Sequence, residues 1–96
     1  MFLVIVDFPP IKASQDEAFK EWFAWSNREL AKQPGFISRR LLKPVTGGNY
    51  IAMIEYENYD TFMAMRSSPI HDEAGRWVEP LLDGHPAPHP YEVVIG

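Results

Sequence analysis

The sequence contains no cysteine, and this absence removes a whole group of chemistries. Without cysteine there is no disulfide, no thiolate metal site and no thiol nucleophile. The chain also lacks an excess of positive charge, since 9 Lys and Arg residues stand against 13 Asp and Glu residues, for a net charge of −4. A protein that binds nucleic acid or an anionic membrane surface needs a basic patch, so we expect neither partner.

Motifs that mark common enzyme classes are also absent. The phosphate-binding loop, the Gly-x-Gly-x-x-Gly pattern of dinucleotide sites and the Gly-x-Ser-x-Gly of serine hydrolases do not occur. His85 and His89 invite a metal interpretation, but four residues of extended, proline-rich chain separate them by about 12 Å. Two ligands of one zinc ion each lie about 2 Å from it. We therefore expect no metal site.

No hydrophobic run is long enough to cross a membrane. The first residues also lack the basic start and the small-residue cleavage pattern of a secretory signal. We therefore expect no membrane association and a cytoplasmic protein.

What the chain does have is enough apolar material for one globular domain. Of its 96 residues, 46% are hydrophobic and 14% are aromatic, and no linker or internal repeat divides them. We expect a single domain over residues 1–96. A chain of this size buries only about 60% of its unfolded surface, so a partner would add to its stability.

The most informative stretch is the strand predicted over residues 2–8. A strand with one solvated face alternates apolar and polar residues, but this one is apolar on both faces and is interrupted only by Asp7. The chain has only enough predicted helix to cover one side of a sheet. We therefore expect a second copy of the chain to cover the other side, giving a homodimer.

The order of predicted elements is βαββαβ. A capping box, Ser14 with Glu17, opens the first helix, which ends before Pro34-Gly35. Ser68, followed by Pro69, opens the last helix. The other elements are strands over 36–45 and 50–57 joined by a turn over 46–49, a short helix from Asn58 or Asp60, a loop over 83–90 and a strand over 91–95. This order predicts a ferredoxin-like α+β fold, with an antiparallel four-stranded sheet covered by helices on one face.

The chain resembles the antibiotic biosynthesis monooxygenase family of dimeric α+β barrels. The resemblance rests on the element order, the size and four motifs: Gln33-Pro34-Gly35-Phe36, Ile54-Glu55-Tyr56-Glu57, Tyr59-Asp60-Thr61-Phe62 and Ser67-Ser68-Pro69-Ile70-His71. It implies two subunits paired through their sheets, each with a pocket between helices and sheet. Such proteins include cofactor-free oxygenases of aromatic polyketides, quinol oxygenases and haem-degrading oxygenases.

The haem-degrading members are the subset that the sequence tests most directly. The resemblance places their asparagine, tryptophan and iron-binding histidine on Asp7, Met65 and Gly75, and none of the three residue types is retained. His71 lies one helical turn before the expected ligand position. We therefore expect no cofactor, with haem binding through His71 as a remaining possibility.

Two residues are candidates for catalysis. Asp7 is the one polar residue of the first strand, and burial in a pocket would raise its pKa into the range of a general base. His71 borders the apolar stripe of its helix, and near a helix N-terminus the dipole favours the neutral imidazole. The structural alternatives are a carboxylate that accepts hydrogen bonds at the strand end and a half-buried histidine with only local bonds.

Aromatic and thioether side chains are the candidates for binding a substrate. The set is Trp22, Phe23, Trp25, Met65 and Trp77, with Trp25 as a lid at the edge of its helix stripe. Arg39 and Arg40 point to opposite faces of their strand, so one of them reaches inward, and we include Arg40 among the candidates. The alternative for both arginines is an edge or interface charge.

Three functions follow from these features and the resemblance. The leading one is a cofactor-independent monooxygenase acting on a small, electron-rich aromatic molecule such as a quinol, phenol or polyketide. The second is a binding module for a small ligand, without catalysis, because an aromatic-lined pocket serves binding equally well. The third is haem binding or degradation.

Overall fold

The structure, a computed structural model, describes all of residues 1–96. Its elements are β1 (Phe2–Asp7), α1 (Asp16–Leu30), β2 (Phe36–Leu42), β3 (Ile51–Tyr56), α2 (Tyr59–Arg66), α3 (Pro69–Val78), a short 3-10 turn η1 (Glu79–Leu81) and β4 (Ala87–Glu92). The four strands form one antiparallel sheet in the order β2-β3-β1-β4. The predicted ferredoxin-like α+β fold is confirmed.

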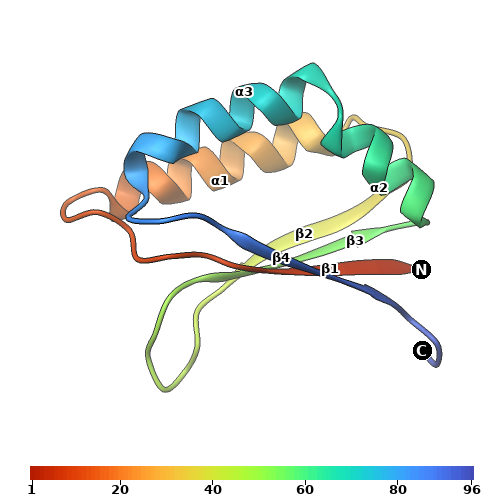
Figure 1. Cartoon of the computed structure of the whole chain (residues 1–96), viewed down its shortest axis with the longest axis horizontal. Coiled ribbons are helices and arrows are strands. Elements are labelled where there is room, and N and C mark those ends of the chain that lie inside the picture. The colour runs from red at the N-terminus through yellow and green to blue at the C-terminus, as the bar shows by residue number, and fades with distance from the viewer.

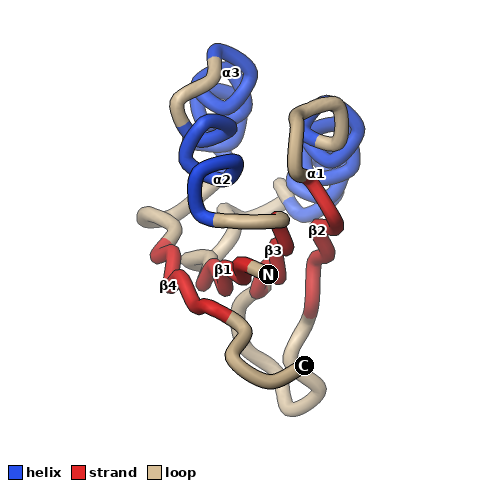
Figure 2. The backbone as a smooth tube through the Cα atoms, turned by 90° about the vertical axis from the view of Figure 1, so that its right-hand side faces the viewer, coloured by secondary structure: helices blue, strands red, loops and turns tan.

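All the helices lie on one face of the sheet. Figure 1 shows α1 and α3 side by side above the strands, with α2 at one end of the same layer. Figure 2, at right angles, shows the same two layers, with the β2–β3 connection and the C-terminal tail extending away from the helices. No helix of the chain is both long and apolar enough to cross a membrane.

The core lies between these two layers. Side chains alternate between the faces of a strand, so every second residue of β1 and β3 meets the helices. The buried strand residues are Phe2, Val4, Ala52, Ile54 and Tyr56, and α1 contributes Phe19, Trp22, Phe23 and Leu30. Aromatic rings meet edge to face, as where Phe8 lies 5.1 Å from Phe19 between ring centroids.

The opposite face of the sheet carries apolar residues on its two central strands beside polar ones such as Asp7, Arg40 and Glu55, and no helix of the chain covers it (Figure 2). The intervening residues of the two central strands, Leu3 and Ile5 in β1 and Ile51 and Met53 in β3, are all partly exposed. Leu42 at the end of β2 is 40% exposed. The sequence-based expectation that both faces of β1 are apolar is therefore met, and no helix of this chain covers the outer face.

The helix starts agree with prediction in two cases of three. The Asn58 side chain accepts from the Thr61 amide at 2.9 Å, and Ser68 Oγ accepts from the His71 amide at 3.4 Å. The capping box of the first helix is wrong, because Ser14 has a φ of 67° and α1 begins two residues later, after an N-cap at Gln15 that makes no side-chain bond.

The last strand begins earlier than predicted. The prolines of residues 83–90 indicated a loop, but β4 includes Pro88 and Pro90. Along a strand, the main-chain amides of successive residues point to opposite sides. The Val93 amide points toward β1, because it donates to the Met1 carbonyl at 3.0 Å. Pro88 and Pro90 are an odd number of residues from Val93, so their nitrogens point to the other side. The prolines therefore turn their missing donors to the free edge of the sheet, where proline is tolerated.

Candidate functional site

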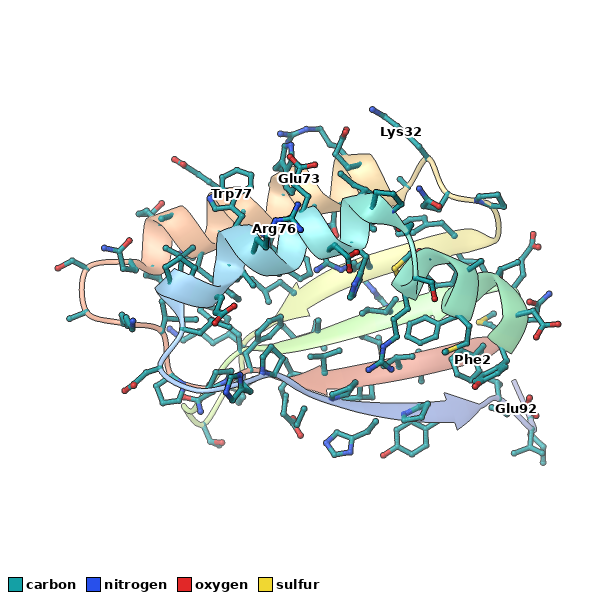
Figure 3. All side chains as sticks on the ribbon, turned by 45° about the horizontal axis from the view of Figure 1, so that its top comes forward. Phe2, Lys32, Glu73, Arg76, Trp77 and Glu92 are labelled. Carbon is teal, nitrogen blue, oxygen red and sulfur yellow. The ribbon has the colours of Figure 1, made fainter.

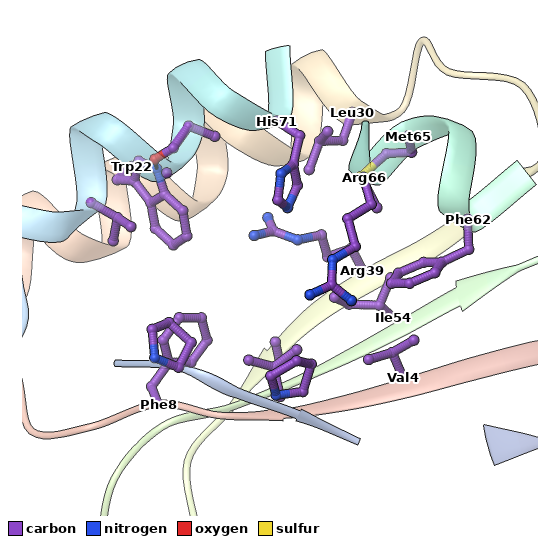
Figure 4. Close-up of a pocket in the computed structure, with 17 residues that line it drawn as sticks. Val4, Phe8, Trp22, Leu30, Arg39, Ile54, Phe62, Met65, Arg66 and His71 are labelled. Atoms are coloured by element: carbon purple, nitrogen blue, oxygen red, sulfur yellow. Dashed lines mark hydrogen bonds between the residues drawn. The ribbon is translucent and has the colours of Figure 1, made fainter. Parts of the chain in front are cut away.

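A cavity of about 280 Å³ lies between the helix layer and the sheet, with walls from every element except η1 (Figure 4). Most of its surface is apolar. The apolar lining residues are Val4, Val6, Phe8, Trp22, Leu30, Ala52, Ile54, Phe62, Met65, Ala74 and Val78, with Pro86 and Pro88 on the β4 side. A concave, mostly apolar site with few polar groups is typical of small-molecule binding.

The ionisable residues of the cavity are Arg39, Arg66 and His71, and no Asp or Glu lines it. Figure 4 shows the three side chains entering the same space from β2, α2 and α3. The three elements that meet here are far apart in the sequence. The cavity therefore combines a hydrophobic wall with two cations and one imidazole.

Arg39 points inward because β2 contains a bulge. The register with β3 shifts between Phe36 and Ser38, so the strict alternation that would have pointed Arg40 inward is broken. Arg39 Nη1 donates to Ser26 Oγ and to Asn27 Oδ1, both at 2.7 Å, and the guanidinium lies 4.0 Å from the centroid of the Phe23 ring. Burial lowers the pKa of Arg39 to about 10, so it remains a cation at pH 7.

His71 lies in the first turn of α3, whose start is fixed by the Ser68 cap and Pro69. Burial lowers the pKa of His71 below its ordinary value of 6.5, and the positive charges of Arg66 and Arg39 add to this, while Asp72 opposes it. His71 is therefore neutral at pH 7. A neutral imidazole facing an apolar cavity can accept a proton.

The structure brings three of the predicted site residues together. Trp22, Met65 and His71 all line the cavity. Trp22 also donates from Nε1 to the Ala74 carbonyl at 2.9 Å, which ties α1 to α3. Phe23 is buried, but it packs beneath the Arg39 guanidinium and is not among the residues that line the cavity.

Asp7 does not line the cavity that contains His71. It lies on the outer face of the sheet, where Oδ2 is 3.1 Å from His89 Nε2. The alternation of β1 explains this placement, because Val4 and Val6 point inward and Asp7 therefore points outward. The structural alternative for Asp7, a polar partner at the end of the strand, describes it better.

Three predicted binding residues also lie elsewhere. Trp25 and Trp77 pack against each other, with ring centroids 4.7 Å apart, and neither lines the cavity. Figure 3 shows Trp77 pointing away from the sheet. Arg40 is on the outer face, 3.4 Å from Glu55 Oε1. Their place in the helix stripe or strand was compatible with the cavity, but helix packing and the β2 bulge direct them away from it.

Among the ionisable residues of the cavity, sequence reasoning missed two. Arg39 was considered together with Arg40, but only Arg40 was included among the candidates. Arg66 lies at the end of α2 and belongs to no apolar stripe, so no pattern marked it. The one available indication was the pair of adjacent arginines, of which one had to face inward.

A family profile described as antibiotic biosynthesis monooxygenase matches residues 1–77. The chain belongs to this family. This match confirms the family resemblance that the sequence motifs indicated. No curated protein matches the sequence.

Solved structures of similar fold agree with the family assignment. Rv0793 of Mycobacterium tuberculosis is 18% identical, with a TM-score of 0.85 over 99% of this chain and 96% of its own. SnoaB of Streptomyces nogalater, a cofactor-independent oxygenase, is 20% identical, with a TM-score of 0.82 over 99% and 95%. MhuD of M. tuberculosis, a haem degrader with two haems bound in its active site, is 24% identical, with a TM-score of 0.78 over 100% and 98%. At these identities the likeness shows the fold.

The positions that the resemblance assigns to haem chemistry carry other residue types in this family member, and its one cavity imidazole, His71, lies one helical turn before the ligand position. Met65 and Gly75, where the resemblance places the tryptophan and the iron ligand of the haem degraders, both line the cavity, but Gly75 offers no ligand atom. The cavity of about 280 Å³ lies below the range of about 300–1,000 Å³ in which proteins enclose drug-sized ligands, and a tetrapyrrole is large for that range. We derive no step through haem. The chain also contains no group of three or more His, Asp or Glu side chains placed to hold a metal ion.

Proposed function

We propose that this protein is a cofactor-independent monooxygenase of small, electron-rich aromatic molecules such as quinols, phenols or polyketides, with His71 as the base. The observation that supports this most is a neutral imidazole in an apolar cavity, close to two guanidinium groups. Membership of the monooxygenase family supports the reaction class. SnoaB, a cofactor-independent oxygenase, shares the fold.

The proposed reaction begins with proton transfer to His71. In the polyketide case the substrate carries an activated ring CH₂ group, and loss of one proton leaves a carbanion that is delocalised onto a ring oxygen. Arg39, which Ser26 and Asn27 hold in place, stabilises the negative charge on that oxygen, and the exposed Arg66 adds a second positive charge beside it. Trp22, Phe62 and the other apolar residues exclude water from the anion.

Oxygen then reacts with the anion directly. The anion transfers one electron to O₂, and the resulting radical and superoxide combine to form a carbon–oxygen bond. The His71 imidazolium returns its proton to the peroxide. His71 then removes the second proton of the former CH₂ group, the O–O bond breaks, and hydroxide leaves with that proton as water. The net change is CH₂ + O₂ → C=O + H₂O, which balances without a cofactor.

Oxygen uptake tests this proposal. We expect the protein to consume O₂ with at least one member of a panel of quinols, anthrones and phenols, and His71→Gln to lower the rate by about 10²-fold or more, the usual contribution of a general base. His89→Gln is the matched control, because His89 lies on the outer face of the sheet beside Asp7. A wild-type rate in His71→Gln contradicts the role of His71.

One observation favours a second function, binding without catalysis. The His71 side chain forms no hydrogen bond with another residue, so nothing orients it as a base. In that case the cavity holds a small aromatic ligand and the protein consumes no oxygen with it. A ligand that binds tightly, with no O₂ uptake across the whole panel, would support this alternative over the monooxygenase.

We also propose that two copies of the chain pair through their outer sheet faces. The support is the uncovered apolar layer of Leu3, Ile5, Ile51 and Met53 on the two central strands. The family resemblance implies the same arrangement. The cytoplasm remains the location that we expect.

A further inference from the structure

The cavity contains positive charge that no acidic residue of the chain balances. Arg39 and Arg66 both line it, and neither forms an ion pair, whereas the neighbouring Arg40 pairs with Glu55 on the other face. Arg39 is buried, and a buried charge is costly unless it is paired, whereas Arg66 lines the cavity from an exposed position. The chain as a whole carries a charge of −4, so the two cations do not belong to a generally basic surface.

Arg39 is held with part of its hydrogen-bonding capacity unused. Its Nη1 donates to Ser26 Oγ and Asn27 Oδ1, which accounts for two of the five N–H donors of a guanidinium. The Nε and Nη2 donors have no acceptor in the chain. A side-on pair of this kind matches the two oxygens of a carboxylate, and the fixed Nη1 means that little side-chain entropy is lost when a ligand binds.

We propose that the cavity selects aromatic anions, with the carboxylate or phenolate oxygen bound by Arg39 and Arg66 and the ring packed against Trp22, Phe8 and Phe62. This inference rests on the proposed function, because it names the substrate class of the same site. The cavity of about 280 Å³ favours a small ligand, since it is smaller than sites for drug-sized ligands. Figure 4 shows the two guanidiniums between His71 and the strands.

The position of the imidazole fits such a ligand. His71 is neutral at pH 7, so it adds no positive charge, and the anion binds to the two arginines. An anion bound at Arg39 and Arg66 would also place its ring beside His71, which enters the same space (Figure 4). The charged oxygen and the atom that loses a proton would then belong to one ligand.

Calorimetric titration with two isosteric probes, 1-naphthoate and 1-naphthamide, tests the proposal at pH 7. They differ in charge and hardly in shape. We expect the wild type to bind the carboxylate about tenfold or more tightly than the amide, in line with a charge-assisted, two-pronged contact. Arg39→Met should reduce this ratio to about threefold or less, and Arg66→Met should reduce it in part. Equal affinity of the wild type for the two probes would overturn the proposal.

Two further variants make the result specific to Arg39. Arg40→Met removes the same charge one residue away, on the outer face, and should leave the ratio unchanged. Asn27→Asp supplies Arg39 with a carboxylate in place of the acceptor that lies 2.7 Å from Nη1, so it should lower the naphthoate affinity about as much as Arg39→Met. This variant also serves if Arg39→Met does not fold. An unchanged ratio in folded Arg39→Met and Asn27→Asp would contradict the assignment.

The binding result and the oxygen result are independent. Preference for naphthoate without O₂ uptake supports the anion site and contradicts the monooxygenase. Turnover of neutral aromatics with no preference for naphthoate contradicts the anion site and leaves the monooxygenase standing.

Discussion

Asn27 and Arg39 hold each other through two hydrogen bonds that run in opposite directions. Arg39 Nη1 donates to Asn27 Oδ1 at 2.7 Å, and Asn27 Nδ2 donates to the Arg39 main-chain carbonyl at 2.9 Å. The first bond fixes the guanidinium in the cavity, and the second satisfies a carbonyl of β2, an edge strand. One side chain of α1 therefore sets both the position of the strand and the position of its cation.

Asn27→Ala should lower the free energy of unfolding by about 2–3 kcal/mol, because it removes one neutral hydrogen bond and one bond to a charged group. Urea denaturation measures the loss. Lys32→Ala is the control, since Lys32, just after α1, pairs with Glu29 and 72% of its side chain is exposed. Such a pair contributes under about 1 kcal/mol. Similar losses in the two variants would contradict the structural importance of Asn27.

The fold was predictable because the local patterns agree with one another. The apolar strands, the helix stripes and the Asn58 and Ser68 caps all indicate βαββαβ, and the structure has that order. The exceptions are local. Ser14 adopts a left-handed conformation, which a serine in the sequence does not indicate. The prolines of β4 indicated a loop because proline removes ladder donors, but at a sheet edge those donors are not needed.

The site was less predictable, because it depends on which way single side chains point. Arg40, not Arg39, would face inward if β2 had no bulge. A bulge cannot be recognised from the residue pattern of a single sequence. For the tryptophans, helix periodicity predicts which face of the helix a side chain lies on, but not which residue it contacts. Trp22 turns toward the sheet, while Trp25 pairs with Trp77 outside it. His71 was identifiable because a capped helix start fixes its position.

The pKa of His71 should be below 6.5, because burial and the two guanidiniums disfavour the imidazolium. NMR titration of the ring measures it. Arg66→Met should raise this pKa by removing a positive charge, yet leave it below 6.5 because burial, the larger cause, remains. Asp72→Asn is the control of opposite sign, since Asp72 favours the charged form, and it should lower the pKa further. An upward shift in Asp72→Asn would contradict this account.

The same pKa shift makes stability depend on pH. Because the folded protein holds the His71 proton less tightly than the unfolded chain, the unfolded state is favoured as the pH falls through 6.5 toward the folded pKa. The wild type should therefore lose stability over that range, and His71→Gln should remove this part of the loss. The pH dependence of kcat/KM should show the same group, with activity falling on the acid side at a pH below 6.5.

Gly35→Ala should be strongly destabilising, for two separate reasons. Gly35 has a φ of 80°, and a Cβ there would lie 2.5 Å from Thr61 Cβ and 2.7 Å from Thr61 Cγ2. Gly47 has a φ of 92° with no atom within 4 Å of a Cβ, so Gly47→Ala reports backbone strain alone. We expect about 1–2 kcal/mol for the strain and about 1–3 kcal/mol more at Gly35 for overpacking. Equal losses in thermal unfolding would show that Thr61 moves aside.

Tyr56→Phe should be neutral or stabilising, which is unusual for a buried residue. The Tyr56 side chain is 1% exposed, and its hydroxyl has no hydrogen-bond partner. Burial raises its pKa to about 12, so the group is a neutral hydroxyl at pH 7. Removing an unsatisfied buried hydroxyl returns up to about 1–3 kcal/mol while the ring keeps its contacts with Phe36 and Phe62.

Tyr50→Phe is the matched control of opposite sign. The Tyr50 hydroxyl donates to Asp16 Oδ1 at 2.6 Å, at the start of α1, so its removal should destabilise the protein. Urea denaturation of both variants gives the comparison. A loss in Tyr56→Phe as large as that in Tyr50→Phe would show that the Tyr56 hydroxyl has a partner after all, such as an ordered water.

Ile5→Lys should separate two paired copies of the chain. Ile5 lies on the outer face of β1, a central strand, opposite Met53 of β3. In a lone chain its side chain is already partly exposed, so a lysine there has little effect on folding, but in a sheet-to-sheet dimer it buries a charge without a partner.

Sedimentation equilibrium should give a wild-type mass of twice 11.0 kDa and a mass of 11.0 kDa for Ile5→Lys. Ala24→Lys makes the same change of charge on the exposed side of α1 and should remain dimeric. A wild-type mass of 11.0 kDa would contradict the dimer, and a dimeric Ile5→Lys would mean that the copies meet through another surface.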